Sequence, residues 1–167
     1  YARRGGKPIV TIGIGIENAG WQPLPVSIDQ DGPMGMTEVD PAHDTRLLMS
    51  AQYDKSNAAL ALNRAFYHKE LAAAVAKGDP VKLLMPDAGR LAWLVLSNKY
   101  FGVYMRPLPT DSSAAAGYIA SVTGLVANPS ATVNNGDMLP RLATFPVPLA
   151  PGATARYAFE VYAGAKD

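Results

Sequence analysis

The chain has 167 residues, of which 49% are hydrophobic and 17% are charged, and its net charge is +1. That length can bury one hydrophobic core, but the near-zero net charge argues against a nucleic-acid partner, because phosphate neutralisation needs a basic surface. The absence of cysteine excludes disulfides and thiolate metal sites. The chain contains no run of about 18 apolar residues, so no membrane span is predicted within it.

The opening stretch VTIGIGIENAG, residues 10–20, has glycines spaced almost as in a dinucleotide-binding loop. The third glycine of a G-x-G-x-x-G loop is replaced by Asn18, and the glycines lie inside an alternating pattern rather than after a strand. One face of this alternation is apolar, and its members are Val10, Ile12, Ile14 and Ile16. We therefore predict a half-buried strand that ends in a turn at 18–20.

Short apolar runs separated by 14 prolines and 15 glycines predict an all-β fold, mainly antiparallel. An extended segment is expected at 21–28 and turns or loops at 29–36 and 128–137, where Asn135-Gly136 is a tight-turn signal. The segment 142–153 is too rich in proline for a central strand. Strands are expected within 45–54, 81–86, 90–98, 99–109, 118–128 and 156–164.

One short helix is expected between Ser56 and Gly78. Tyr67, Leu71 and Val75 recur at four-residue spacing in an alanine-rich run, and Gly78 is placed as a C-terminal stop. The start of the helix is open: it can be confined to 67–77, with 58–66 extended.

The two histidines, His43 and His68, are the only plausible acid–base residues, and neither has metal-ligand spacing. His43 lies beside Asp40 and Asp44 in a polar loop, where a turn residue is the favoured interpretation over catalysis. His68 is expected on the solvated face of the helix. No nucleophilic serine motif is present, so we predict no catalytic turnover, no cofactor and no metal site.

Acidic residues gather in one loop region, and calcium binding is the alternative to a solvated loop. The spacing of an EF-hand is absent, which favours the solvated loop. The residues are Asp29, Asp31, Glu38, Asp40 and Asp44.

An aromatic set near the middle of the chain can belong to the core or line a groove for an apolar peptide or partner. Strand alternation places Tyr100 and Tyr104 on one face and Phe101 on the other, with Trp93 on the preceding strand. The core is the favoured interpretation, and Trp93, Tyr100 and Tyr104 are the candidate groove residues.

Three stretches, in order, resemble the large periplasmic domain of the YidC membrane-protein insertases. IENAGWQPLPV, within 9–26, resembles the family's strand ending in an N-x-G-x-x-P-L turn, and RLAWLVLSNKYFGVYMRPLP, 90–109, resembles its tryptophan strand and the apolar strand after it. LAPGATARYAFEVYAGAKD, within 149–167, resembles the closing P-G turn and last strand, although Ala165 stands where proline is usual.

The resemblance implies a β-supersandwich like that of the galactose mutarotases, as a non-catalytic periplasmic domain of a bacterial inner-membrane insertase and chaperone. It also implies partners: the Sec translocon, its accessory proteins and nascent membrane proteins. Because the sequence opens on Tyr1 and enters a strand almost directly, we expect residues 1–167 to form one domain that is a piece of a longer one. Missing N-terminal strands would then leave an apolar sheet face or edge uncovered.

Two other functions suit the same kind of sandwich, since a fold alone does not determine function. A mutarotase-like sugar-active enzyme needs a general acid and base at one sugar pocket, usually histidine with glutamate. A carbohydrate-binding or adhesion sandwich would use an exposed aromatic such as Trp21 or Trp93 as a stacking platform.

Overall fold

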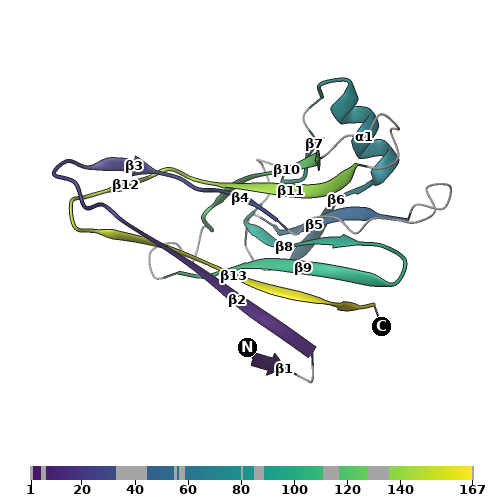
Figure 1. Ribbon diagram of the computed structural model, residues 1–167, viewed down its shortest axis with the longest axis horizontal. Helices are drawn as coiled ribbons and strands as arrows, with labels where there is room; N and C mark the ends of the chain where they lie inside the picture. The colour runs from purple at the N-terminus through teal and green to yellow at the C-terminus, as the bar shows by residue number, and fades with distance from the viewer. Residues whose placement is uncertain are drawn as a thin grey trace.

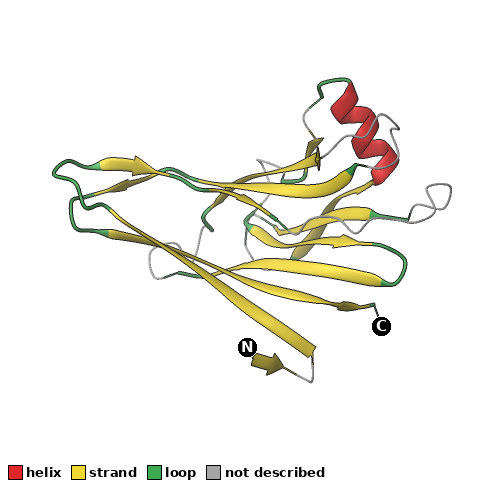
Figure 2. Cartoon of the chain, in the orientation of Figure 1, coloured by secondary structure: helices red, strands yellow, loops and turns green. Residues whose placement is uncertain are grey.

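The computed structural model describes residues 2–4, 7–32, 45–54, 56, 59–79, 81–84, 89–110, 117–127 and 136–166. These residues form an antiparallel β-sandwich with one short helix beside its smaller sheet (Figures 1 and 2). The predicted fold class is confirmed.

The structure contains almost every expected strand, and its elements are numbered in chain order. They are β1 (Ala2–Arg4), β2 (Lys7–Glu17), β3 (Leu24–Val26), β4 (Asp29–Asp31), β5 (Leu47–Tyr53), β6 (Leu60–Tyr67), α1 (His68–Ala76), β7 (Val81–Lys82), β8 (Leu91–Ser97), β9 (Phe101–Leu108), β10 (Ile119–Ala127), β11 (Asp137–Thr144), β12 (Val147–Leu149) and β13 (Thr154–Ala165).

The larger layer is a seven-stranded sheet in the order β1-β2-β13-β9-β8-β5-β6. The strand predicted at the start of the chain is β2, and it pairs along its length with β13, with Ile14 opposite Tyr157 and Ile12 opposite Phe159. The glycines of VTIGIGI therefore belong to a strand, and the dinucleotide-loop alternative is excluded by the observed conformation.

The smaller layer is a four-stranded sheet in the order β4-β11-β10-β7, and β12 and β3 form a separate two-stranded sheet. In Figure 1 the two larger sheets lie one above the other, with β3 and β12 at the far left. The core fills the space between them, because the inward-facing residues of both layers are apolar. Its fully buried members include Leu48, Leu94, Met138, Leu142 and Phe159.

Two expectations about the smaller sheet are wrong. Residues 29–31, expected in a turn or loop, form the edge strand β4. Residues 142–144, expected outside any central strand, belong to β11, which lies between β4 and β10. Proline has no backbone N–H to donate. Pro140 is accommodated in β11 because β4 pairs only with residues 141–143, so no backbone donor is needed at position 140. Beside it the Gly32 N–H donates to the Pro140 carbonyl.

The helix begins at His68 and ends at Ala76, which confirms the shorter of the two predicted extents, and residues 60–67 before it are strand β6. The prediction that His68 lies on a solvated face is wrong. Its side chain is 1% exposed, and its Nε2 lies 3.0 Å from the carbonyl oxygen of Gly136. It is the first residue of α1, and it contacts Gly136, directly before β11, so its role is structural.

The turn after β2 is held by a buried asparagine, Asn18. Its Nδ2 donates to the carbonyls of Gln22 and Leu149, and its Oδ1 accepts from the Gly20 N–H. Its backbone also pairs with the turn before β13, at Gly152 and Ala153. Asn18 therefore fixes the end of β2 against the start of β13, which explains why Glu17 and Thr154 lie opposite each other.

No helix in the described part of the chain combines the length and hydropathy of a membrane span.

Candidate functional site: an aromatic cleft on the larger sheet

The outer face of the seven-stranded sheet, which points away from the core, carries a cavity of about 420 Å³. We call it the aromatic cleft. Its lining residues come from β2, β8, β9 and β13 and are Ile9, Trp93, Tyr104, Met105, Arg106, Glu160 and Tyr162.

Strand register places the aromatic residues together. Tyr104 of β9 is directly opposite Tyr162 of β13, and on its other side it is opposite Val95 of β8. Trp93 precedes Val95 by two residues and so shares its face. The Tyr104 ring centroid lies 6.5 Å from that of Trp93, edge to face, and 5.9 Å from that of Tyr162. The three rings form a continuous apolar wall.

A charged pair closes one side of the same cleft. Arg106 and Glu160 are opposite each other in the β9–β13 ladder, and Arg106 Nε and Nη2 lie 2.6 Å and 2.5 Å from Glu160 Oε2. Both contacts use one carboxylate oxygen, so Oε1 of Glu160 remains an open acceptor among the described residues. The Glu160 side chain is 22% exposed and the Arg106 side chain 50% exposed, so both reach solvent in the cleft.

The structure brings together two of the three candidate groove residues. Trp93 and Tyr104 line the cleft, whereas Tyr100 lies in the turn between β8 and β9 and is 59% exposed. Asn98 Oδ1 accepts hydrogen bonds from the backbone N–H groups of Tyr100 and Phe101, which fixes that turn. That the cleft takes a peptide or partner stays a prediction.

The candidates from the sequence do not include five residues of the cleft: Ile9, Met105, Arg106, Glu160 and Tyr162. In RYAFEVYAG, residues 156–164, alternation puts Arg156, Ala158 and Glu160 on the face opposite Tyr157, Phe159 and Val161, and the same alternation puts Tyr162 on the face of Glu160. The partner strand of β13 could not be found in this way, because pairing between β9 and β13 joins residues far apart in sequence.

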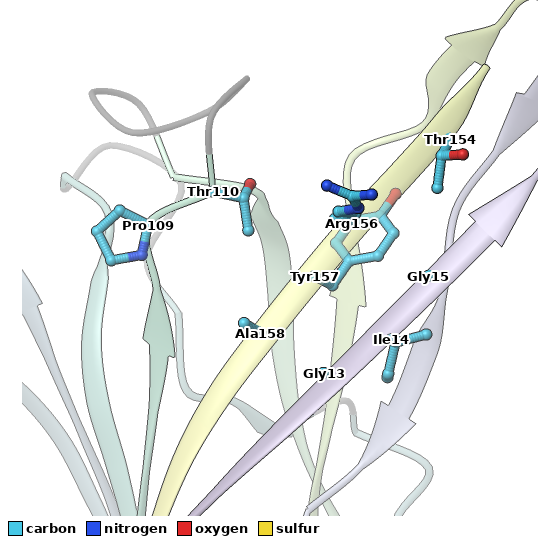
Figure 3. A pocket seen from close by; sticks show the side chains of 9 residues that line it. All are labelled: Gly13, Ile14, Gly15, Pro109, Thr110, Thr154, Arg156, Tyr157 and Ala158. Carbon is cyan, nitrogen blue, oxygen red and sulfur yellow. The ribbon is translucent and has the colours of Figure 1, made fainter.

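A second cavity of about 550 Å³ lies further along β2 and β13, where β9 has ended (Figure 3). Gly13, Gly15 and Ala158 leave its floor almost without side chains, and Thr110, Thr154 and Arg156 stand around it. No aromatic ring is exposed there among the described residues, because Tyr157, which also lines it, is 3% exposed and belongs to the core. The smaller aromatic cleft is therefore the better candidate for a ligand with apolar faces.

The other candidates from the sequence do not assemble a site. His43, Glu38, Asp40 and Asp44 lie outside the described residues, and His68 is buried at the start of α1. Asp31 is held by Arg141, with Oδ1 2.7 Å from Nε and Oδ2 3.1 Å from Nη2. These hydrogen bonds from the guanidinium lower the pKa of the Asp31 carboxyl. In the described part of the chain, no group of three His, Cys, Asp or Glu residues could hold a metal.

Trp21, the second stacking candidate, lies in the turn after β2 and is 96% exposed. It lines neither of the two cavities. A ring that projects into solvent outside either cavity offers a ligand no enclosing surface, so it is a weaker platform than Trp93.

Comparison with solved structures shows that the fold is that of an aldose 1-epimerase-like protein. A candidate aldose 1-epimerase from Escherichia coli K12 superposes with a TM-score of 0.52 at 9% sequence identity, over 96% of this chain and 57% of that one. The chain thus spans a little over half of that neighbour's length. No family model matches the chain, and no curated protein matches it.

These findings correct two expectations from the sequence. The expected non-catalytic insertase domain and the expected absence of enzymatic activity are contradicted by a structural neighbour whose name is that of a sugar enzyme. The finding favours the alternative, a mutarotase-like sugar-active enzyme or carbohydrate-binding sandwich. At 9% identity the likeness shows the fold alone, so the function has to be argued from the cleft. The expected location and partners stay predictions.

Proposed function

We propose that this chain is a carbohydrate-binding domain of the mutarotase-like sandwich class, and that it holds a pyranose in the aromatic cleft. The observation that carries the proposal is the combination of Trp93, Tyr104 and Tyr162 with the Arg106–Glu160 pair in one cavity.

A pyranose has apolar C–H faces and a rim of hydroxyls, and the cleft offers a partner for each. The rings of Trp93 and Tyr104 supply apolar area with little loss of side-chain entropy, as aromatic residues do in binding sites. Glu160 Oε1 can accept a hydrogen bond from a sugar hydroxyl, and the remaining guanidinium N–H groups of Arg106 can donate to another. A cavity of about 420 Å³ has room for a monosaccharide or one unit of a longer chain.

Titration with a panel of aldohexoses, followed by tryptophan fluorescence, tests the proposal. The chain has two tryptophans, so Trp21→Ala leaves Trp93 as the reporter and should bind with unchanged affinity. Trp93→Ala should weaken binding at least about tenfold, because it removes a central aromatic contact. A flat titration with every sugar, or equal binding by the Trp93→Ala and wild-type proteins in an isotope-labelled NMR titration, would refute sugar binding at this cleft.

Mutarotase-type turnover is the second candidate, and the open Oε1 of Glu160 favours it. Ring opening at the anomeric carbon needs a base that takes the proton of the anomeric hydroxyl and an acid that gives a proton to the ring oxygen as its bond to that carbon breaks. The Glu160 carboxylate is a suitable base, and water that reaches its partly exposed side chain can supply the proton. Polarimetry of a freshly dissolved aldohexose should then show faster mutarotation with the wild-type protein than with Glu160→Gln. Glu17→Gln, an exposed glutamate at the end of β2, is the matched control. Binding without any acceleration would leave the binding function and exclude this one.

A further inference from the structure

Among the described residues, no strand lies beside one edge of β2 over most of its length. β1 pairs only with Lys7, Pro8 and Ile9, and no described strand pairs with the outer edge of residues 10–16. In Figure 1, β2 runs along the border of the molecule with β13 on its inner side. A free row of backbone donors and acceptors in a strand is a template for another strand.

The backbone groups that point to the open edge can be assigned from the register. The Lys166 N–H donates to the Tyr100 carbonyl, so even-numbered residues of β13 point to β9 and odd-numbered ones to β2. Tyr157 and Phe159 are opposite Ile14 and Ile12, so these two isoleucines direct their backbone groups to β13. The N–H and C=O groups of Thr11, Gly13 and Gly15 therefore point outward.

This edge lacks the devices that natural proteins use to block strand addition. Between Ile9 and Glu17 there is no charged residue and no proline, and the β2–β13 register runs without a bulge over those residues. Val10 and Ile12 are 43% and 40% exposed although they lie on the core face of the sheet. On the opposite face, a side chain added at Gly13 or Gly15 would meet no atom within 4 Å.

The sequence of the edge is almost a mirror image about Gly13: Val10-Thr11-Ile12 precedes it and Ile14-Gly15-Ile16 follows. In an antiparallel pair of two such strands centred on Gly13, Ile12 lies opposite Ile14 and Val10 opposite Ile16. Thr11 lies opposite Gly15 on the other face. Every contact on the core face is then between β-branched apolar residues, which are favoured cross-strand pairs.

We propose that two copies of this chain associate through β2, in antiparallel register about Gly13, to form a two-fold symmetric dimer with one continuous sheet. The outward groups of Thr11, Gly13 and Gly15 meet Gly15, Gly13 and Thr11 of the second copy, giving about six hydrogen bonds. β1 sets the limit of the pairing, because it occupies the same edge up to Ile9. A two-fold axis brings the same patch of both copies together, as this near-mirror sequence requires.

Sedimentation across a range of concentrations tests the proposal. The mass should rise from 17.7 kDa toward twice that value as concentration increases. Gly13→Pro removes the central outward N–H and should abolish the dimer, while pairing with β13, which uses the groups of Ile12 and Ile14, is kept. Gly13→Lys places two ammonium groups opposite each other and should weaken the dimer about five- to tenfold. Gly13→Thr, the matched control at the same position, should dimerise at least as well as wild type.

Amide hydrogen exchange supplies a second readout that does not depend on any variant folding. The amides of Thr11, Gly13 and Gly15 should become protected as concentration rises, and the amides of Ile12 and Ile14 should be protected at every concentration. A monomer at all concentrations overturns the proposal. So does a dimer that survives Gly13→Pro, or one in which the Gly13 amide of the wild-type protein stays unprotected, because its interface would lie elsewhere.

Discussion

An aromatic cluster lies on each face of the seven-stranded sheet, and β13 contributes to both. The inner cluster consists of Tyr157 and Phe159 of β13 together with Tyr118, which directly precedes β10 of the smaller sheet, and their exposures are 3%, 0% and 6%. The outer cluster is the aromatic cleft, where Tyr104 is 37% exposed.

Both clusters use edge-to-face contacts at similar distances. Tyr118 lies 5.5 Å from Tyr157 and 5.8 Å from Phe159, while Trp93 lies 6.5 Å from Tyr104. The difference between them is what lies opposite: the four-stranded sheet covers the inner cluster, and no described element covers the cleft. Similar residues therefore stabilise the fold on one face and are available to a ligand on the other.

Phe159→Ala should produce the largest effect and tests the inner half of the comparison. The ring is fully buried between Tyr118 and the core leucines, so its removal should lower the free energy of unfolding by about 3–5 kcal/mol. Tyr104→Ala in the cleft should cost much less stability and weaken sugar binding instead. Urea unfolding of both variants measures this, and equal losses of stability would remove the distinction between the two faces.

The stability of the protein should fall above pH 10 because of Tyr118. Burial raises the pKa of its hydroxyl to about 12 against an ordinary value of 10.0. The unfolded chain then loses this proton at lower pH than the folded one. The stabilisation is complete below pH 10 and is lost as pH rises through the folded pKa, by about 2–3 kcal/mol. Denaturant unfolding between pH 9 and 12 should show a shallower decline in Tyr118→Phe.

Two tyrosines of the inner cluster should respond in opposite directions to loss of the hydroxyl at neutral pH. Tyr118→Phe removes the hydrogen bond to Ala158 and leaves a buried carbonyl, which should cost about 1 kcal/mol. The buried Tyr157 hydroxyl has no hydrogen-bond partner, so Tyr157→Phe should be neutral or stabilise by up to about 1 kcal/mol. Thermal unfolding compares them. A clear loss in Tyr157→Phe would mean that its hydroxyl has a partner in solution.

Trp21→Ala should have the smallest effect. The ring is 96% exposed, so the change in the free energy of unfolding should stay within about 0.5 kcal/mol. Sugar binding should also be unchanged, which separates an exposed aromatic from one in a cleft. If this variant loses sugar binding while Trp93→Ala keeps it, the ligand site lies at the turn after β2.

The strands could be predicted from the sequence because their signals are local. The alternation of isoleucine and glycine marked β2, and the four-residue spacing with Gly78 marked the helix. The failures have a physical cause as well. β4 and the central position of β11 depend on pairing between segments about 110 residues apart, such as Asp31 with Arg141, and local pattern does not encode such pairing. His68 has charged neighbours in sequence, but it is buried in the tertiary structure, where it contacts Gly136 directly before β11.

The candidate site, too, can be predicted from the sequence only in part. Residue alternation along single strands predicts the class of fold, the aromatic content of β8 and β9, and the outward position of Glu160. Alternation does not show that Trp93 and Tyr104 share a cleft with Tyr162, that Arg106 holds Glu160, or that Tyr100 stays outside the cleft. Those facts depend on the order and register of strands, which are set by the packing of the whole sheet against its partner layer.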